Sequence, residues 1–214
     1  MPPPRRDPPR ILPRPDLDQP MPPRVSPRPE AQKPSLPKGA QAKPAPAKPA
    51  LPTEPKARLE ALFGRLHEAQ SPAEARQTEK EIERMLERSG SATADLVLAR
   101  AGQAFAGRDF DTALDLLDYT LALRPHFAEG YHRRAQVHLM RKDEEAALRD
   151  LRITLALEPR HFMALATFAG LMRASGDRKG AYKALTRLKD LNPHFPDIGE
   201  VLEKLRPEIE GQKI

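Results

Sequence analysis

The stretch KDEEAALRDLRITLALEP, residues 142–159, decides the fold because the chain repeats it on both sides. RDFDTALDLLDYTLALRP (108–125) precedes it, and GDRKGAYKALTRLKDLNP (176–193) follows it at the same spacing of 34 residues. Each copy has an aspartate at its second position, an alanine four residues later and a proline at its end. Several independent positions that share one period indicate a structural repeat.

Each recurring residue has a mechanical role in a pair of packed helices. Asp109, Asp143 and Asp177 are expected to cap the second helix of a pair by accepting its free N–H groups. Small residues allow two helices to approach closely, leucines fill the space beside that contact, and proline ends the second helix. The small residues are Ala101, Ala135 and Ala169, each with a second alanine twelve residues later at 113, 147 and 181, and the leucines are Leu117, Leu151 and Leu185. A unit of this size cannot bury its own apolar face, so neighbouring units must stack.

This pattern resembles the tetratricopeptide repeat (TPR), a helix–turn–helix unit of the same length. Three units match, at residues 94–127, 128–161 and 162–195. The position where the family usually has an aromatic residue near the start of the unit holds Val97, Tyr131 and Leu165. The resemblance implies an all-α, right-handed solenoid of three TPR units.

Helical segments are expected on both sides of the three units. Residues 56–93 are predicted to form a helical hairpin, in which Ser71 caps the second helix, Pro72 takes its first position and Glu74 completes a capping box. Residues 60–93 are in register as a fourth unit, but they carry His67 and Glu79 where small residues belong, so we interpret them as a degenerate repeat that caps the array. Residues 196–214 are predicted to form a C-terminal capping helix and tail, with inward-facing apolar residues at Ile198, Val201, Leu202 and Leu205.

Residues 1–55 differ sharply in composition from the rest of the chain. They hold 19 of the 25 prolines, which favour extended polyproline II structure and prevent helix formation. They also hold 10 Lys or Arg against 5 Asp or Glu, so the arm carries most of the net charge of +6. We expect a disordered, Pro-rich spacer; a proline-motif ligand and a basic tether with weak affinity for anionic surfaces or nucleic acid are the alternatives.

The histidines of LALRPHFAEGYHRRAQVHLM (121–140) raise the question of a chemical site. His126 is expected in the turn between two units, and His132 and His138 lie six positions apart on one helix, roughly 240° around its axis. These histidines therefore cannot converge on one ion from a single helix face. The chain has no cysteine and no motif of a hydrolase, metalloprotease or nucleotide-binding loop, so no catalytic, metal or cofactor site is predicted. A regular pattern of base-reading residues is also missing, so no specific nucleic-acid binding is expected.

The TPR resemblance implies that the first helix of each unit lines a concave groove. Its groove positions correspond here to Asp95, Leu98, Gly102 and Phe105; to Glu129, His132, Gln136, Leu139 and Met140; and to Met163, Ala166, Gly170 and Arg173. The two-carboxylate clamp of chaperone-binding TPR proteins requires Lys and Asn at positions that hold other residues here, namely Leu98, Gly102, Arg133, Met163 and Thr167. A lining that is mixed but apolar at its centre favours a peptide or partner protein in the groove.

A narrower resemblance covers most of the expected folded part. ERSGSATADLVLARA (87–101), PRHFMALATFAG (159–170) and PEIEGQKI (207–214) resemble small alphaproteobacterial TPR proteins, a family that is often exported and has no assigned enzymatic activity. The predicted function is therefore a non-catalytic scaffold for protein–protein interaction, and the alternative is a structural module that self-associates or is tethered through its basic arm. The start of the chain has no apolar stretch of signal-peptide length, so we expect a cytoplasmic location; a periplasmic one would require an upstream start. No run of apolar residues is long enough to span a membrane.

Overall fold

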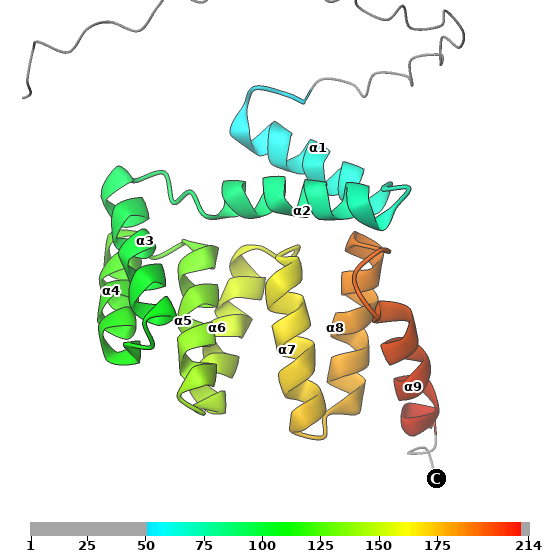
Figure 1. The fold of residues 1–214 in the computed structure, drawn as a ribbon. Helices are drawn as coiled ribbons and strands as arrows, with labels where there is room; N and C mark the ends of the chain where they lie inside the picture. Colours follow the sequence, from blue (N-terminus) through cyan, green and yellow to red (C-terminus); the bar gives the residue numbers. More distant parts are fainter. Residues whose placement is uncertain (1–50, 211–214) are drawn as a thin grey trace, which may run out of the picture. The chain divides into compact units, whose positions relative to one another are not determined.

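The computed structural model describes residues 51–210, which form nine α-helices and no β-strand. The helices are α1 (Pro55–His67), α2 (Pro72–Leu86), α3 (Ala92–Ala106), α4 (Phe110–Leu123), α5 (Ala128–Met140), α6 (Glu144–Leu157), α7 (Phe162–Ala174), α8 (Arg178–Leu191) and α9 (Ile198–Glu210). Helices α3 to α8 pack as three antiparallel pairs that follow one another, with α9 against α8 (Figure 1). The all-α solenoid of three TPR units is as predicted. Most of the predicted Pro-rich arm and the last four residues of the tail lie outside the described residues.

The repeated residues have the mechanical roles expected of them. The side chains of Asp109, Asp143 and Asp177 accept backbone N–H groups at the starts of α4, α6 and α8, at donor–acceptor distances of 3.2, 2.9 and 2.8 Å. The alanine pairs at the helix contacts are buried, as are the three leucines beside them. Each second helix ends two residues before its proline. One period of sequence thus produces three nearly equivalent helix pairs.

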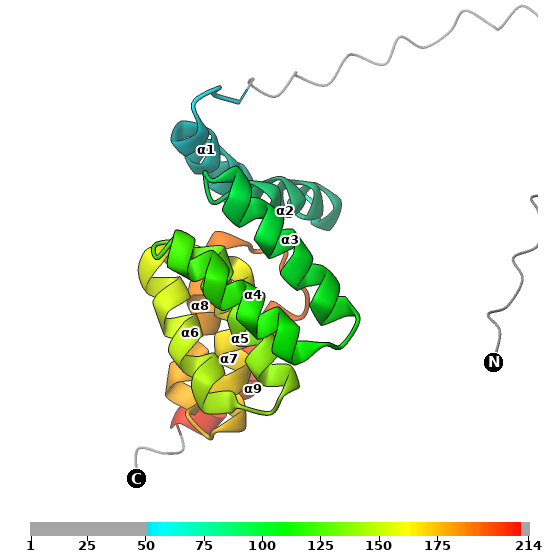
Figure 2. The ribbon, with the colours of Figure 1, turned by 90° about the vertical axis from the view of Figure 1, so that its left-hand side faces the viewer.

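The N-terminal hairpin of α1 and α2 does not continue this stack as a fourth unit in register would. It lies transverse to the paired helices, across one end of them (Figures 1 and 2). Its apolar side chains, including Leu62, Leu66 and Ile82, share a core with residues of α7, α8 and α9. Leu96 of α3 is consequently 55% exposed, whereas the equivalent Gly130 and Ala164 are buried.

The two residues that break the repeat pattern explain this position. His67 donates from Nδ1 to the carbonyl oxygen of Asp190 at 2.5 Å, and Glu79 accepts a hydrogen bond from the side chain of Asn192. Both partners, Asp190 and Asn192, lie at the end of α8. The small residues usual at positions 67 and 79 of the pattern could not form these hydrogen bonds. The side chains that prevent regular stacking therefore hold the hairpin in its transverse position.

Arg160 of the turn between α6 and α7 adds a further anchor. Its guanidinium donates to both carboxylate oxygens of Glu60 at 2.6 and 2.9 Å and lies 4.3 Å from the ring centre of Phe63. His194, in the equivalent turn after α8, donates to the carbonyl oxygen of Ala69 at 2.8 Å. The inter-unit turns of the second and third units thus contribute side chains that bind the hairpin.

The capping helix α9 follows the prediction closely. Ile198, Leu202 and Leu205 are buried, and Val201 is half-buried against the same core. At the start of α2, Ser71 accepts the N–H of Glu74 as expected, whereas the Glu74 carboxylate accepts the N–H of Gln70 at 3.3 Å. Within residues 51–210, every helix is too short or too polar to cross a bilayer.

Candidate functional site

A cavity of about 360 Å³ lies between α3 and α5, at several of the positions predicted to line the groove. We call this cavity the groove pocket. Its apolar lining consists of Leu98, Ala99, Ala101, Gly102, Phe105, Leu117 and Val137, and its polar lining of Glu87, Asp95, Arg133 and Gln136. Gly102 lies at its open side, because a Cβ atom added there would meet nothing within 4 Å. The groove pocket therefore offers an apolar surface of the size of a large side chain or a short peptide segment.

The charged groups of the groove pocket are already paired within the protein. Arg133 donates to Glu87 at 2.7 Å and also to Glu129. Asp95 accepts the backbone N–H of Ser89 at 2.8 Å and its hydroxyl at 2.5 Å. Each of these charged groups therefore has an ion-pair or hydrogen-bond partner within the chain, beside the apolar floor of the groove pocket.

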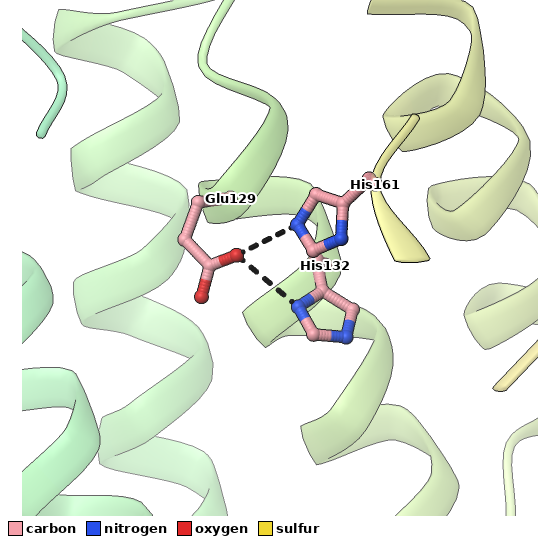
Figure 3. A group of neighbouring side chains, drawn as sticks. All are labelled: Glu129, His132 and His161. Atoms are coloured by element: carbon pink, nitrogen blue, oxygen red, sulfur yellow. Dashed lines mark hydrogen bonds and ion pairs between the residues drawn. The ribbon is translucent and has the colours of Figure 1, made fainter. Parts of the chain in front are cut away.

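A second cavity, of about 240 Å³, lies where the C-terminal end of α2 meets the first turns of α5 and α7. Three of its lining residues form what we call the histidine network: Glu129 and His132 of α5 and His161, which precedes α7 (Figure 3). They are only 4%, 3% and 3% exposed. His132 Nδ1 lies 3.2 Å from the Glu129 carboxylate, and His161 Nε2 lies 2.8 Å from the same oxygen.

The contacts of the other two ring nitrogens fix the protonation of both imidazoles. The backbone N–H of Ala164 donates to His161 Nδ1 at 3.3 Å, so the ring proton of His161 is on Nε2 and is donated to Glu129. The side chain of Gln136 donates to His132 Nε2 at 3.4 Å, so His132 donates to Glu129 from Nδ1. Both rings are neutral in this arrangement, and Arg133 balances the charge of the carboxylate.

Electrostatics favours this distribution of protons. Burial by itself raises the pKa of Glu129, but the hydrogen bonds from His132 and His161 and the charge of Arg133 outweigh it and hold that pKa below its ordinary value. Burial lowers the pKa of His132, because a charged ring would lose its hydration. The network therefore consists of one ionised carboxylate that two neutral imidazoles solvate.

Glu129, His132 and His161 are also the types of residue that bind zinc, and one ligand atom of each lies within 4.8 Å of the others. A metal-binding imidazole usually donates its remaining N–H to an acceptor, which fixes the tautomer needed for coordination. Here the Nδ1 atom of His161 faces an N–H donor, that of Ala164, so the nitrogen that faces Glu129 carries the proton. The surroundings of His161 therefore do not fit a metal ligand, and the network holds α5 and the start of α7 together.

The residues predicted for the groove fall into five groups. Those that line the groove pocket are Asp95, Leu98, Gly102, Phe105 and Gln136. Those in the second cavity are Glu129, His132, Met163 and again Gln136, of which Glu129 and His132 are buried and hydrogen-bonded rather than exposed. Leu139 and Ala166 are half-buried in the packing between helices, and Met140 and Gly170 are exposed outside both cavities. Arg173 lies in a different cavity, beside α9.

Sequence reasoning missed the contact between His161 and His132. Of the three histidines between residues 121 and 140, His126 is exposed, and His138 lies 3.9 Å from both Asp143 and Asp150. These three do not form one site, as predicted. The ring of His161 lies 4.5 Å from that of His132, measured between ring centres. The available signal was the position of His161 in an inter-unit turn, which places it beside the first helix of the preceding unit.

Comparisons with known proteins agree with this architecture. No protein-family model matches the chain. A TPR repeat-containing protein of Rhizobium etli is 32% identical over 161 residues, which cover 75% of this chain and 79% of the relative.

Solved structures with a similar fold are TPR domains. The first TPR domain of Spaghetti (RPAP3), bound to the HSP90 peptide SRMEEVD, has a TM-score of 0.51 and 19% identity, and the match covers 55% of this chain and 93% of that one. The Sgt2 TPR domain from Aspergillus fumigatus has a TM-score of 0.50 and 20% identity, with 56% and 81% covered. The TPR2B domain of yeast Sti1, in a pHsp70 complex, has a TM-score of 0.50 and 17% identity, with 55% and 99% covered. At these identities the likeness concerns the fold.

Proposed function

Because the chain belongs to the family of TPR repeat-containing proteins, we propose that it is a non-catalytic binding module that holds a segment of a partner protein in its concave groove. The observation that carries this proposal is the groove pocket between α3 and α5. It combines an open apolar floor with charged groups that already have partners within the chain. Such a surface gains free energy by removing an apolar side chain of a ligand from water, at about 25 cal/mol per Å² of buried apolar area.

The shape of the groove favours a peptide or a helix as ligand. Gly102 and Gly170 lie in the same position of two first helices, and a Cβ atom at either would meet nothing within 4 Å. A ligand backbone can therefore approach α3 and α7 closely. TPR domains with the same fold have been solved with an HSP90 peptide and in a pHsp70 complex, which supports peptide binding by this architecture.

The histidine network supports the non-catalytic part of the proposal. A general base needs a free nitrogen or carboxylate oxygen within reach of a substrate. Each ring nitrogen of His132 and His161 already has a hydrogen-bond partner, and both rings are buried. This group therefore serves to join two units of the repeat.

Partner capture by a Gly102→Glu variant tests the proposal. The new side chain occupies the open side of the groove pocket and places a carboxylate over its apolar floor, so we expect capture of the partner to fall at least about tenfold, or about 1.4 kcal/mol. The measurement is a crosslinking pull-down from the source organism, quantified by mass spectrometry.

Gly64→Glu is the matched control. Gly64 is an exposed helical glycine of α1 with open space around it, so the variant has the same change of charge and the same gain in helix propensity. We expect this variant to capture the partner as the wild type does. Equal capture by the wild type and both variants would overturn the proposed groove function.

A further inference from the structure

A third cavity, of about 380 Å³, lies where α7 ends, α8 begins and α9 packs beside them. We call it the C-terminal pocket. Its lining consists of Arg173, Arg178, Val201, Lys204, Leu205 and Glu208. Three cationic side chains and one carboxylate therefore surround two apolar residues, whereas the groove pocket has one cation, two carboxylates and a larger apolar floor.

The repeat register places the C-terminal pocket in the same row as the groove pocket. Lys204 of α9 follows Gly102, Gln136 and Gly170 at the common spacing, so α9 takes the place of the first helix of a further unit. The row of helices α3, α5, α7 and α9 thus begins with an apolar pocket and ends with a basic one.

The cations of the C-terminal pocket are only partly neutralised. Arg178 pairs with Glu208. Lys204 pairs with Glu200 at 3.5 Å, but both side chains are about three-quarters exposed, and such a surface pair contributes little. The side chain of Arg173 is exposed and has no ion pair or hydrogen bond with any residue of the described part, 51–210. Its guanidinium is therefore available to an external anion, for which it offers a planar, two-point hydrogen-bonding geometry.

We infer that the C-terminal pocket binds carboxylate groups of an acidic segment in the partner protein. This inference rests on the proposed function, since it names the chemistry of the ligand that continues along the groove from the groove pocket. Arg173 and Lys204 bind the carboxylates, and Val201 and Leu205 contact an apolar side chain next to them.

Charge argues against the chain's own N-terminal arm as the occupant of this pocket. Residues 1–55 contain 10 Lys or Arg and 5 Asp or Glu, so their net charge has the same sign as that of the pocket. The residues involved also differ from the positions of the two-carboxylate clamp of chaperone-binding TPR proteins, which hold Leu98, Gly102 and Met163 among others.

Fluorescence anisotropy with two synthetic peptides tests the inference on the full chain. The first probe is a short fluorescein-labelled peptide of alternating leucine and glutamate, and the second has glutamine in place of every glutamate. At low ionic strength we expect the glutamate peptide to bind about tenfold more tightly than the glutamine peptide. This difference in affinity should decrease at higher salt, because salt of about 0.1 M screens exposed charges beyond about 10 Å.

Two charge-reversal variants separate the pocket from the general charge of the chain. Arg173→Glu is expected to lower the affinity for the glutamate peptide by about tenfold and to leave the affinity for the glutamine peptide within about twofold of the wild type. Arg152→Glu changes the net charge equally at an exposed position of α6, so it leaves the affinity for both peptides within about twofold. The basic arm attracts the acidic probe equally in both variants, so their difference reports on the pocket.

Equal affinity for the two peptides, or equal losses in Arg173→Glu and Arg152→Glu, would overturn the inference. Its failure is distinguishable from failure of the proposed function. If Gly102→Glu loses partner capture while Arg173→Glu binds the glutamate peptide as the wild type does, the proposed groove function is supported and the acidic ligand is excluded.

Discussion

Single residues of the repeat have roles that depend on which neighbour they meet. His161 caps α7 through Nδ1 and donates to Glu129 through Nε2, so one side chain links two successive units. His194 lies in the equivalent turn one unit later, where it binds the hairpin at Ala69. His126, in the turn after the first unit, is exposed. The same residue type in three similar turns therefore has three different environments.

The histidine network makes stability depend on pH. Burial lowers the pKa of His132 below its ordinary 6.5. Below about pH 6.5 the unfolded chain therefore binds more protons than the folded chain, which lowers the free energy of unfolding. The pKa of Glu129 is also lowered, from 4.5, so the unfolded chain again binds more protons in that range. Both shifts have the same sign. We expect the midpoint of urea unfolding to fall as pH decreases below about 6.5 and to fall further near pH 4.5.

Two variants identify the source of this pH dependence. His132→Asn removes the titrating ring, so the decrease in urea midpoint between about pH 7.5 and 5.5 becomes smaller than in the wild type. His126→Asn removes an exposed ring and leaves the decrease unchanged. An equal decrease in the wild type and both variants would show that the network is not its source.

The groove pocket was partly predictable at the level of residues. The TPR resemblance implies which positions of a first helix face the groove, and five of them line the pocket: Asp95, Leu98, Gly102, Phe105 and Gln136. The ion pair between Arg133 and Glu87 could not be predicted, because it joins α5 to the segment after α2. That contact depends on how the α1–α2 hairpin is oriented relative to α3, and the repeat pattern does not specify this orientation.

Among the helices, the hairpin of α1 and α2 is the one whose position the 34-residue repeat does not predict. His67 and Glu79 indicated that this segment departs from the pattern, but their bonding partners at the end of α8 are more than a hundred residues away in sequence. Local pattern gave the helices, their caps and their apolar faces. It did not specify which surface of the solenoid those faces cover.

An Ile82→Ala variant tests the position of the hairpin. Ile82 is fully buried in the core that α2 shares with α7 and α8, so we expect the free energy of unfolding to decrease by about 2–4 kcal/mol. Amide hydrogen exchange should accelerate in α2 and in the helix ends of α7 and α8. Acceleration in α2 and α3 instead, with α7 and α8 unchanged, would indicate a hairpin that stacks on the first unit.

At the level of the whole described molecule, the hairpin and α9 have different effects on the groove. The hairpin contributes Glu83 and Leu86 of α2 to the second cavity, which residues of α5 and α7 also line. Helix α9 follows α3, α5 and α7 in the repeat register and lines the basic C-terminal pocket. The described surface is therefore apolar at the pocket between α3 and α5 and cationic at the pocket beside α7, α8 and α9.

Site-specific photo-crosslinking in the full chain tests the central claim, that a partner binds in the groove. A photo-reactive residue is placed at Phe105 in the groove pocket, at Tyr119, which is 54% exposed on α4, or at Ala45 in the N-terminal arm. The groove account predicts that the partner lost in Gly102→Glu is crosslinked from Phe105 and not from Tyr119. Crosslinking of that partner from Ala45 or Tyr119, with none from Phe105, would contradict it and favour tethering or self-association outside the groove.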